Sequence, residues 1–320
     1  MSLEISTFDN SQESQWESFC ESCINSTFLH SRSFLNYHGE RFKDVSLFIK
    51  DSKDIIALIP LAVSPADSSV IVSHPGITFG GIIHSGKLRG PKMIEAIKLI
   101  SHFLNRQGFR ELIYKAPPQI YSLSPSQDDI FALHSLGAQR FRTDLSSTID
   151  LTQPFELSER RRRGLKKASK LIDLSSDDDY LDELWEVIRE NLARKHSVKP
   201  VHSLDELLQL KKKFPHQIFI RVGLVEGKVE GGMVFFGTPR VWHAQYIAAS
   251  LKGYENCVLD SVTFHAIQDA QEAKIHYFDF GISNDPSKNN ELNEGLFKFK
   301  SEFGSGAIVY EHYRLKLGNE

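Results

Sequence analysis

The chain has 320 residues, of which 41% are hydrophobic and 25% are charged, and its formal net charge is −3. This composition excludes a disordered or fibrous chain, and the near-neutral charge argues against binding of nucleic acid over the whole surface. At roughly 100–200 residues per domain, the length predicts two domains.

Hydrophobic periodicity in the first half predicts alternating helices and extended segments. Helices are expected at 13–24, 32–42, 91–107 and 127–136, and extended chain at 45–50, 54–63, 69–84, 111–115 and 137–150. Pro91 suits the first turn of the third helix, and Gly108 suits its end.

The second half predicts the same order of elements. Helices are expected at 179–195, 204–214, 255–272 and 291–303, and strands at 217–225, 228–237, 240–248, 276–280 and 306–317. Matching helices end at Gly108 and Ala273, 165 residues apart, and matching strands follow at the same offset. We therefore expect two copies of one α/β domain with mixed sheets, because a solenoid has a much shorter period.

The sequence predicts chemistry that needs no metal and no bound nucleotide cofactor. Cys20 and Cys23 share a helix face with Trp16 and Phe19, so they are expected in the core, and a structural zinc needs about four ligands. The chain has no phosphate-binding loop, dinucleotide fingerprint or His-Glu-x-x-His helix. It also lacks an apolar run of the ~18 residues of a membrane span and a secretory signal, so the cytoplasm is the expected compartment.

A basic segment joins the two halves. Residues 160–170 carry seven basic side chains and are followed by the acidic run 177–179. The segment is either a solvated linker helix or a contact for phosphates or an RNA backbone, and the sequence leaves both open.

Two segments of the second half could form a site. The predicted strand, loop and helix across 241–257 would present free backbone N–H groups suited to a pyrophosphate, although an ordinary connecting loop has the same pattern. Gly253 would allow close backbone approach there. The last helix carries a predicted inward-facing stripe at Leu292, Leu296, Phe299 and Phe303. Lys300 lies on the neighbouring stripe with Asn293, so it is expected either to extend to water or to face a cleft.

Gly295-Leu296-Phe297-Lys298-Phe299-Lys300-Ser301-Glu302-Phe303-Gly304 resembles the closing motif of FemAB-like acyltransferases, a branch of the GNAT superfamily. The basic segment, the strand at 278–281, residues 27–31 and Gly80-Gly81 also fit this resemblance. It implies two tandem GNAT-like domains with a cleft between them. The acceptor-side domain is expected at 1–155, and the donor-side domain at 156–320 with a basic linker helix at 158–170.

The resemblance also implies a donor site, which is expected at Ile247, Ala248, Ala249, Lys252, Gly253, Tyr254 and Asn256. The acceptor candidates are His30, Arg32, Ser73, His74, Gly80, Gly81, Asn284, Asn293 and Phe299, and a capping or turn role is the alternative for those in the first half. Lys300 matches the family's functional lysine by its place in the motif, while His243, Tyr246 and Glu294 are candidate acids or bases. Strand alternation places His243 and Tyr246 on opposite faces unless a bulge intervenes.

The leading functional hypothesis is a transferase that moves an acyl group from acyl-CoA, with acetyl-CoA favoured, to an amine or hydroxyl of a cell-envelope sugar or peptide. Backbone N–H groups near Ile247–Ala249 would stabilise the oxyanion. An aminoacyl-tRNA-dependent transferase that builds a peptidoglycan peptide bridge is the first alternative, since members of the family use either donor. A non-catalytic ligand-binding domain pair is the second, because the sequence singles out no general base.

Overall fold

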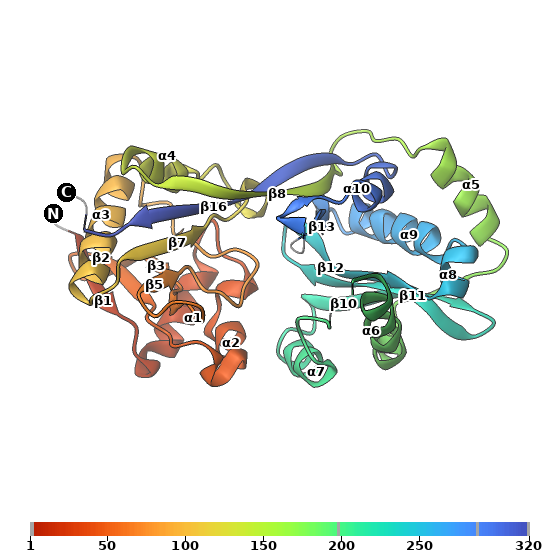
Figure 1. Cartoon of the computed structure of the whole chain (residues 1–320), viewed down its shortest axis with the longest axis horizontal. Coiled ribbons are helices and arrows are strands. Elements are labelled where there is room, and N and C mark those ends of the chain that lie inside the picture. Colours follow the sequence, from red (N-terminus) through yellow and green to blue (C-terminus); the bar gives the residue numbers. More distant parts are fainter. Residues whose placement is uncertain (1–2, 197–198, 286–287, 319–320) are drawn as a thin grey trace. The chain divides into compact units, whose positions relative to one another are not determined.

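The computed structural model describes residues 3–196, 199–285 and 288–318 and divides into two compact units (Figure 1). Unit 1 comprises Met1–Asp144 and Val309–Glu320, and unit 2 comprises Leu145–Ile308. The chain leaves unit 1 within strand β8 (Gln139–Asp150) and returns to it within strand β16 (Gly306–Lys316). Unit 1 is therefore built from two separate stretches of sequence.

Unit 1 folds around strands of two sheets. One sheet has the order β1 (Leu3–Thr7), β2 (Leu47–Asp51), β3 (Asp54–Ile59), β6 (Ile83–His84). The other has the order β4 (Ala62–Val63), β5 (Val70–Val72), β7 (Glu111–Lys115), β16, β8. Strands β5 and β7 are parallel, whereas β7 and β16 are antiparallel.

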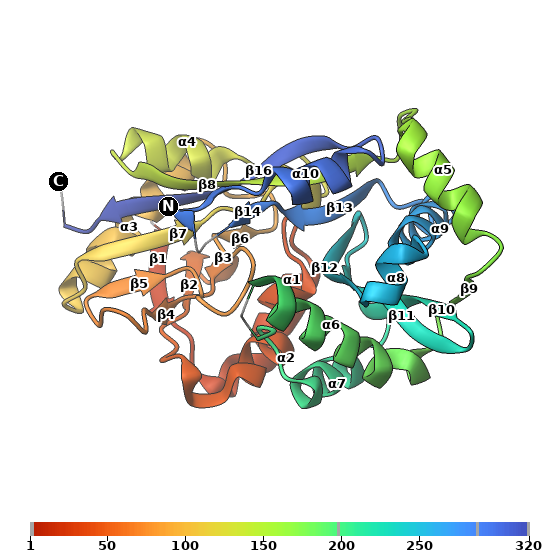
Figure 2. The same ribbon diagram turned by 45° about the vertical axis from the view of Figure 1, so that its right-hand side comes forward.

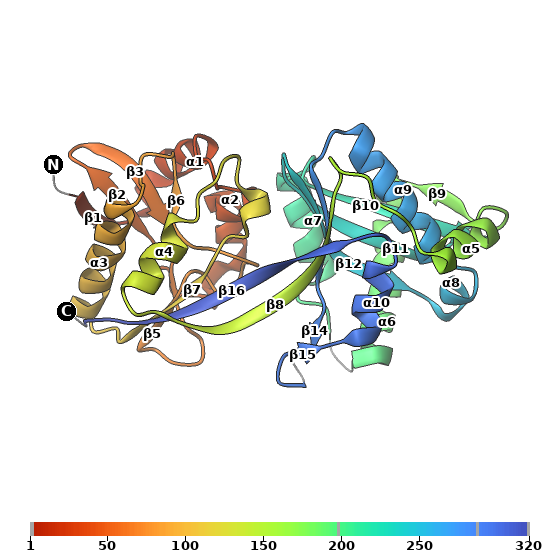
Figure 3. The same ribbon diagram turned by 90° about the horizontal axis from the view of Figure 1, so that it is seen from above.

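Helices of unit 1 lie beside these strands (Figure 2 and Figure 3). They are α1 (Glu13–Glu21), α2 (Arg32–Leu35), α3 (Pro91–Arg106) and α4 (Asp128–Ser135), with 3-10 turns at Asn10–Gln12, Phe28–His30, Asn36–Arg41 and Gln119–Tyr121. Met93, Ile97, Ile100 and Leu104 of α3 are buried at helical spacing, as their sequence pattern predicts. Cys20 and Cys23 are buried free thiols, which confirms their expected place in the core.

Unit 2 has one mixed sheet between helices. The strand order is β8, β13 (Tyr277–Ile282), β12 (Val241–Ala249), β11 (Lys228–Gly237), β10 (Ile218–Val225), β9 (Asp173–Ser175). Only the β12–β13 pair of this sheet is parallel. Glu226 and Gly227 both adopt positive φ in the turn between β10 and β11, which suits a tight hairpin.

Helices cover both faces of the unit 2 sheet (Figure 1). They are α5 (Glu159–Ala168), α6 (Leu181–His196), α7 (Leu204–Lys213), α8 (Leu251–Glu255), α9 (Val258–Glu272) and α10 (Glu294–Ser301), with a 3-10 turn at Asp178–Tyr180 and the short strands β14 (Asn284–Asp285) and β15 (Glu291–Leu292). Val262 of α9 packs with Met233, Phe235 and Phe278 on one face. Trp185 of α6 contacts Tyr246 on the other.

The two units repeat one order of elements. Each unit has a helix between the two strands of its parallel pair, and a further helix and a long strand after that pair: α3 matches α9, β7 matches β13, α4 matches α10 and β8 matches β16. Glu111 and Tyr277 begin equivalent strands, and Asp128 and Glu294 begin equivalent helices, each pair 166 residues apart. This architecture agrees with the duplication that the sequence offset predicts.

The structure differs from the expected boundaries at several points. Residues 309–320 lie in unit 1 rather than in the second domain, because β16 pairs with β7, and the chain enters unit 2 at Leu145. The helix expected at 255–272 is broken into α8 and α9 at Cys257, which adopts a left-handed φ of 61°. Leu292 does not join the inward stripe of the last helix, because it precedes that helix and is 39% exposed. Across the described ranges, no helix is both long and apolar enough for a bilayer crossing.

Candidate functional site

Strands β12 and β13 run parallel for only three paired residues. Their register ends at His243 opposite Asp279, although β12 continues to Ala249 and β13 to Ile282. Beyond this point each strand turns to its other neighbour, β11 or β8. The sheet therefore parts at its parallel pair, and the residues at this point are the natural candidates for a site.

A β-bulge lies in β12 just beyond this point. Phe235 pairs with Ala244 and Val234 pairs with Tyr246, so Gln245 is an extra residue without a partner on β11. A bulge resets the alternation of side chains along a strand. His243 and Tyr246 therefore share one face of the sheet, whereas regular alternation without a bulge would place them on opposite faces. The Gln245 side chain also carries a buried Oε1 with no hydrogen-bond partner among the described residues.

His243 forms an ion-pair-like contact with a buried carboxylate. Its Nδ1 lies 2.8 Å from Oδ2 of Asp279, which is fully buried. Oδ1 of Asp279 accepts hydrogen bonds from Oγ of Ser146 at 2.5 Å, Oγ1 of Thr148 at 3.0 Å and the amide of Gly281 at 3.2 Å. Two hydroxyls from β8 and one backbone amide thus fix the carboxylate that orients the imidazole.

Lys300 of α10 is buried beside this pair. Its Nζ donates to the carbonyl of Gly281 at 2.8 Å and to that of Ile282 at 2.7 Å, and only 3% of the residue is exposed. Burial lowers the pKa of Lys300 to about 7, while the negative charge of Asp279 acts in the opposite direction. The expectation that Lys300 extends to water is therefore wrong. Its ammonium holds the end of β13 next to the His243–Asp279 pair.

Tyr246 and Glu294 have different surroundings from His243. The Tyr246 hydroxyl lies 2.7 Å from Nδ1 of His202, and burial raises its pKa to about 12, which makes it a poor proton acceptor at neutral pH. Glu294 is exposed at the first position of α10, where a carboxylate favours the helix dipole. Of the predicted acids and bases, the structure brings His243 and Lys300 together around Gly281.

The expected donor residues follow β12 directly. Ala248 and Ala249 are buried at the end of the strand, and Ile247 packs against the core beneath α9. Gly253 in α8 is required by close backbone approach, since a Cβ there would lie 2.0 Å from the carbonyl oxygen of Glu230. The Glu230 carboxylate also accepts a hydrogen bond from Ser250 at the start of α8.

The remaining donor candidates lie on the surface of α8 and just after it. Lys252 pairs with Glu226 at 2.6 Å, and both side chains are exposed. Tyr254 is 38% exposed and receives a hydrogen bond from Nζ of Lys195 at 2.6 Å. Asn256 donates to the carbonyl of Lys252 at 2.9 Å. These contacts are local, and they leave the predicted donor role as a proposal.

The basic segment forms α5, which packs beside the start of α9 (Figure 2). Arg161 anchors it, with contacts of 3.0 Å to Asp260 and 3.1 Å to Glu302, and it is 3% exposed. Gly164 also faces Asp260, because a Cβ there would meet the Asp260 carboxylate at 2.4 Å. Lys167 reaches the carbonyl of Glu255 at the end of α8. The structure therefore brings the basic segment to the α8–α9 junction of the predicted donor segment.

Six of the expected acceptor residues lie in unit 1 and are buried. The amide of Thr27 donates to Nδ1 of His30 at 3.0 Å, and burial lowers the pKa of His30 to about 4. Arg32 pairs with Asp44 at 2.5 Å and lies over the ring of Phe8 at 3.6 Å. Burial lowers the pKa of Arg32, and Asp44 opposes that effect.

The other unit 1 candidates lie where β5 and β7 part. Their parallel register ends at Val72 opposite Ile113, and the Oγ of Ser73 then accepts from the amide of Lys115 at 2.7 Å. His74 has a left-handed φ of 61°, and burial, followed by the positive charge of nearby side chains, lowers its pKa to about 2. Gly80 donates its amide to the Lys115 carbonyl at 3.0 Å. Gly81 has a φ of 82°, which favours glycine.

Three acceptor candidates lie in unit 2 around α10. Asn293 is the N-cap of that helix, and its Oδ1 accepts from the amide of Leu296 at 3.0 Å. Asn284 accepts from the amide of Leu145 at 2.6 Å and donates to the carbonyl of Asn290 at 2.8 Å. Phe299 lies under the guanidinium of Arg161, 4.3 Å from it. All three stabilise the local fold, and their acceptor role stays a prediction.

Sequence reasoning missed several residues of the site. Asp279, Ser146 and Thr148 were not among the candidates, although the strand 278–281 belongs to the family resemblance. A charged residue within an otherwise apolar strand, Tyr277–Ile282, was the available signal for Asp279. No comparable signal marks Ser146 and Thr148, because their role depends on the pairing of β8 with β13.

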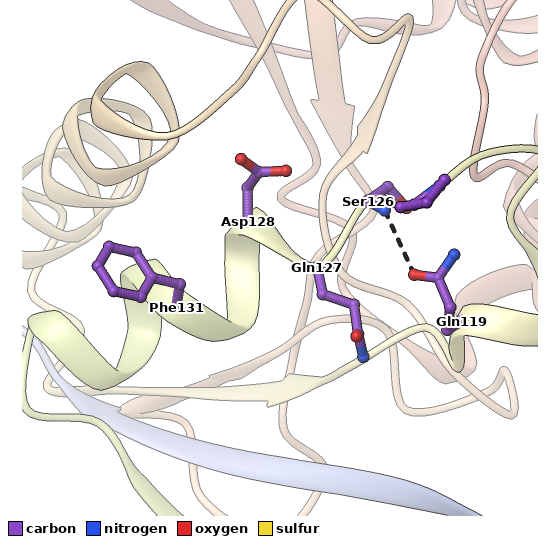
Figure 4. A pocket seen from close by; sticks show the side chains of 6 residues that line it. Gln119, Ser126, Gln127, Asp128 and Phe131 are labelled. Carbon is purple, nitrogen blue, oxygen red and sulfur yellow. Dashed lines mark hydrogen bonds between the residues drawn. The ribbon is translucent and has the colours of Figure 1, made fainter.

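The described residues show no metal cluster and one open pocket away from the predicted site. No group of three or more His, Cys, Asp and Glu side chains in these ranges is placed to hold a metal ion. An open pocket in unit 1 is lined by Gln119, Pro125, Ser126, Gln127, Asp128 and Phe131. Figure 4 shows its side chains, among which the Ser126 amide donates to Oε1 of Gln119 at 3.3 Å. It includes none of the predicted site residues.

Comparison with known proteins identifies the fold. No protein-family model and no curated protein sequence matches the chain. Its structure is similar to the crystal structure of FemX, with 11% identity, coverage of 98% of this chain and 97% of that chain, and a TM-score of 0.68. It is also similar to L-PGS from Bacillus licheniformis, with 16% identity, coverage of 96% of this chain and 90% of that chain, and a TM-score of 0.61. A tandem GNAT protein from the clavulanic acid biosynthesis pathway has 10% identity, full coverage of both chains (100% each) and a TM-score of 0.55. The chain has the tandem GNAT fold, which confirms the predicted fold class.

Proposed function

We propose that this chain is an acyltransferase that carries an acyl group from a CoA thioester to an amine or hydroxyl of a cell-envelope sugar or peptide. The observation that carries the proposal is the parting of β12 and β13 at His243 and Asp279. A strand whose edge is no longer paired offers backbone groups to an extended donor, and a histidine stands at the point where the edge becomes free. The tandem GNAT fold supports the same class of reaction.

Acyl transfer requires two kinds of group at this point. The carbonyl carbon passes through a tetrahedral oxyanion, which backbone N–H groups near Ile247–Ala249 would stabilise. The attacking amine or hydroxyl must lose a proton, for which His243 is the favoured acceptor. Lys300 supports this arrangement by holding the carbonyls of Gly281 and Ile282 in place.

An aminoacyl-tRNA donor is the second candidate, and the α5 surface favours it. Arg163 and Lys166 are exposed three residues apart on α5, and Lys170 is exposed two residues beyond its end. They add to the positive charge of Lys167 at the α8–α9 junction. A row of basic side chains suits successive phosphates of a nucleic acid backbone.

Ligand-induced stabilisation separates the candidates. A ligand at a hundredfold excess over its Kd stabilises the folded protein by about 2.7 kcal/mol. We expect acetyl-CoA or another acyl-CoA to raise the melting temperature and to release free CoA when an amine or hydroxyl acceptor is added. If no acyl-CoA stabilises the protein, the leading proposal is wrong. Binding of an acyl-CoA without transfer to any acceptor favours the non-catalytic alternative.

Charge reversal on α5 tests the RNA alternative. A variant with Arg163→Glu, Lys166→Glu and Lys170→Glu is compared with Lys53→Glu, Lys87→Glu and Lys98→Glu, three exposed sites in unit 1 with the same change in net charge. An aminoacyl-tRNA-dependent enzyme should lose tRNA affinity only in the α5 variant, with a smaller dependence of binding on salt. Equal tRNA affinity in both variants contradicts this alternative.

A further inference from the structure

The Asp279 carboxylate is organised more fully than its pairing with His243 alone requires. It is fully buried in β13, and its Oδ1 accepts from Ser146, Thr148 and the amide of Gly281. Its Oδ2 lies 2.8 Å from Nδ1 of His243. Burial of an ionised carboxylate is costly unless hydrogen bonds compensate, and these donors supply that compensation. They also fix the direction in which Oδ2 points.

This arrangement determines which nitrogen of His243 carries the proton. An ionised carboxylate can only accept hydrogen bonds, so Nδ1 of the neutral imidazole must be the protonated nitrogen. The lone pair then lies on Nε2, whereas the hydrogen bond of the ring to the described residues is made by Nδ1. The His243 side chain keeps 12% of its surface exposed. The ring is thus held from its Nδ1 side and keeps part of its surface exposed.

Gly281 leaves space for the ring in this position. A Cβ at Gly281 would lie 3.2 Å from Cε1 of His243, which is tighter than ordinary van der Waals contact. The residue also has a φ of 75°, which favours glycine, and its carbonyl receives the Lys300 ammonium. The same residue therefore connects the imidazole, the carboxylate and the lysine.

We propose that Asp279 is a positioning residue that fixes the tautomer of His243, so that Nε2 accepts the proton of the acyl acceptor. This inference rests on the proposed acyltransferase function. The acceptor N–H or O–H proton moves to Nε2 as its heteroatom forms a bond to the acyl carbon. The C–S bond of a thioester donor, or the C–O bond of an ester donor, then breaks. The imidazolium returns its proton to the leaving thiolate or alkoxide, and His243 is neutral again.

Asp279→Asn tests the proposal because it keeps the size of the side chain but adds a donor. The amide can donate to Nδ1 and thereby move the ring proton to Nε2. We expect kcat to fall by about 10²-fold or more, with the KM for the donor nearly unchanged. The kcat of His243→Ala should fall to a similar level. The kcat of the double variant should be no lower than that of either single variant. Asp173→Asn makes the same change at an exposed carboxylate on β9, so it should keep the kcat of the wild type.

Nitrogen-15 NMR of the imidazole provides a readout that needs no substrate. Wild type should show protonated Nδ1 and unprotonated Nε2 in the neutral ring, and Asp279→Asn should shift the population towards protonated Nε2. Wild type with protonated Nε2, or Asp279→Asn with the kcat of the wild type, overturns the positioning role. If the wild type transfers no acyl group from any donor, the proposed function itself fails, which is a distinct result.

Discussion

Two lysines, the buried Lys300 and the half-buried Lys115, donate to pairs of backbone carbonyls near a parting of parallel strands, one in each unit. In unit 2, Lys300 binds the carbonyls of Gly281 and Ile282. In unit 1, Lys115 binds those of His74 and Ile77. Burial lowers the pKa of each lysine to about 7. Each ammonium donates hydrogen bonds to these carbonyls, and the free energy needed to keep the lysine protonated in the folded protein increases with pH.

The low pKa of Lys300 predicts a pH-dependent stability. Between pH 7 and 10.5 the unfolded chain keeps this proton while the folded chain releases it, so the free energy of unfolding rises with pH across that window. From pH 7 to pH 9 this contribution is about 2 kcal/mol. The free energy of unfolding, measured with urea, should therefore rise less between pH 7 and pH 9 for Lys300→Met than for wild type.

Lys298→Met is the control for this measurement, because Lys298 lies exposed on the same helix. It should keep the rise of the wild type. Identical rises in wild type and Lys300→Met would show that Lys300 is not the group that titrates.

The sequence alone singled out individual site residues, but it did not reveal which residues they contact. The motif around 295–304 singled out Lys300, and the strand 241–248 singled out His243. Periodicity cannot reveal that Lys300 binds carbonyls or that Asp279 faces His243, because both contacts join residues far apart in sequence. Their pairing follows only from the order of strands in the sheet.

Helix α5 shows how one buried charge holds an otherwise exposed element. Arg161 contacts Asp260 and Glu302, and its guanidinium lies 4.3 Å from the ring of Phe299 and 4.8 Å from that of Phe303. Removal of one partner from a buried ion pair leaves the other charge without compensation. The docking of α5 should therefore depend on this side chain.

Arg161→Met should lower the free energy of unfolding by about 3–5 kcal/mol. Arg162→Met is the matched control: Arg162 is 51% exposed and pairs with Glu159 within the same helix, so its loss should change stability by no more than about 0.5 kcal/mol. Urea denaturation of both variants measures the difference. Equal stability of the two variants contradicts an anchoring role for Arg161.

Most elements could be predicted because their periodicity is regular, whereas irregular features could not. The helices α3 and α9 and the strands β10 and β11 lie close to their expected ranges. The bulge at Gln245 and the break at Cys257 leave no clear pattern in the residue types. The bulge matters most, because it places His243 and Tyr246 on the same face.

For the whole molecule, the two copies of the domain differ at their parallel pairs of strands. In unit 1 the chain itself fills the space where β5 and β7 part. Gly80 donates to the Lys115 carbonyl, and a Cβ at Gly80 would lie 2.0 Å from the Ser73 carbonyl oxygen. In unit 2 the described residues place no comparable segment between β12 and β13. Among the described residues, no strand pairs with β12 on its β13 side beyond His243.

This difference predicts one donor molecule per chain, if the proposed function is correct. Calorimetric titration with acetyl-CoA should give a stoichiometry close to one. Asn256→Asp, which adds a negative charge beside α8, should weaken that binding, whereas Asn105→Asp in unit 1 should not. Two equivalent binding events per chain would contradict the prediction.

The duplication was visible in the sequence, but the assignment of the last strand was not. The offset between equivalent elements locates both copies, because it depends only on the order of helices and strands. It places residues 306–317 in the second copy by sequence order. Pairing of His312 and Tyr313 with Lys115 and Tyr114 instead puts the end of that strand in unit 1.

The return of β16 to unit 1 has a consequence for synthesis on the ribosome. Strand β16 lies between β7 and β8 in the sheet, so the first 144 residues emerge without an internal strand of their own unit. Unit 2 is a single continuous stretch and has all its strands once residue 308 has emerged. Unit 2 can therefore complete its fold first, whereas unit 1 must wait for residues 309–316.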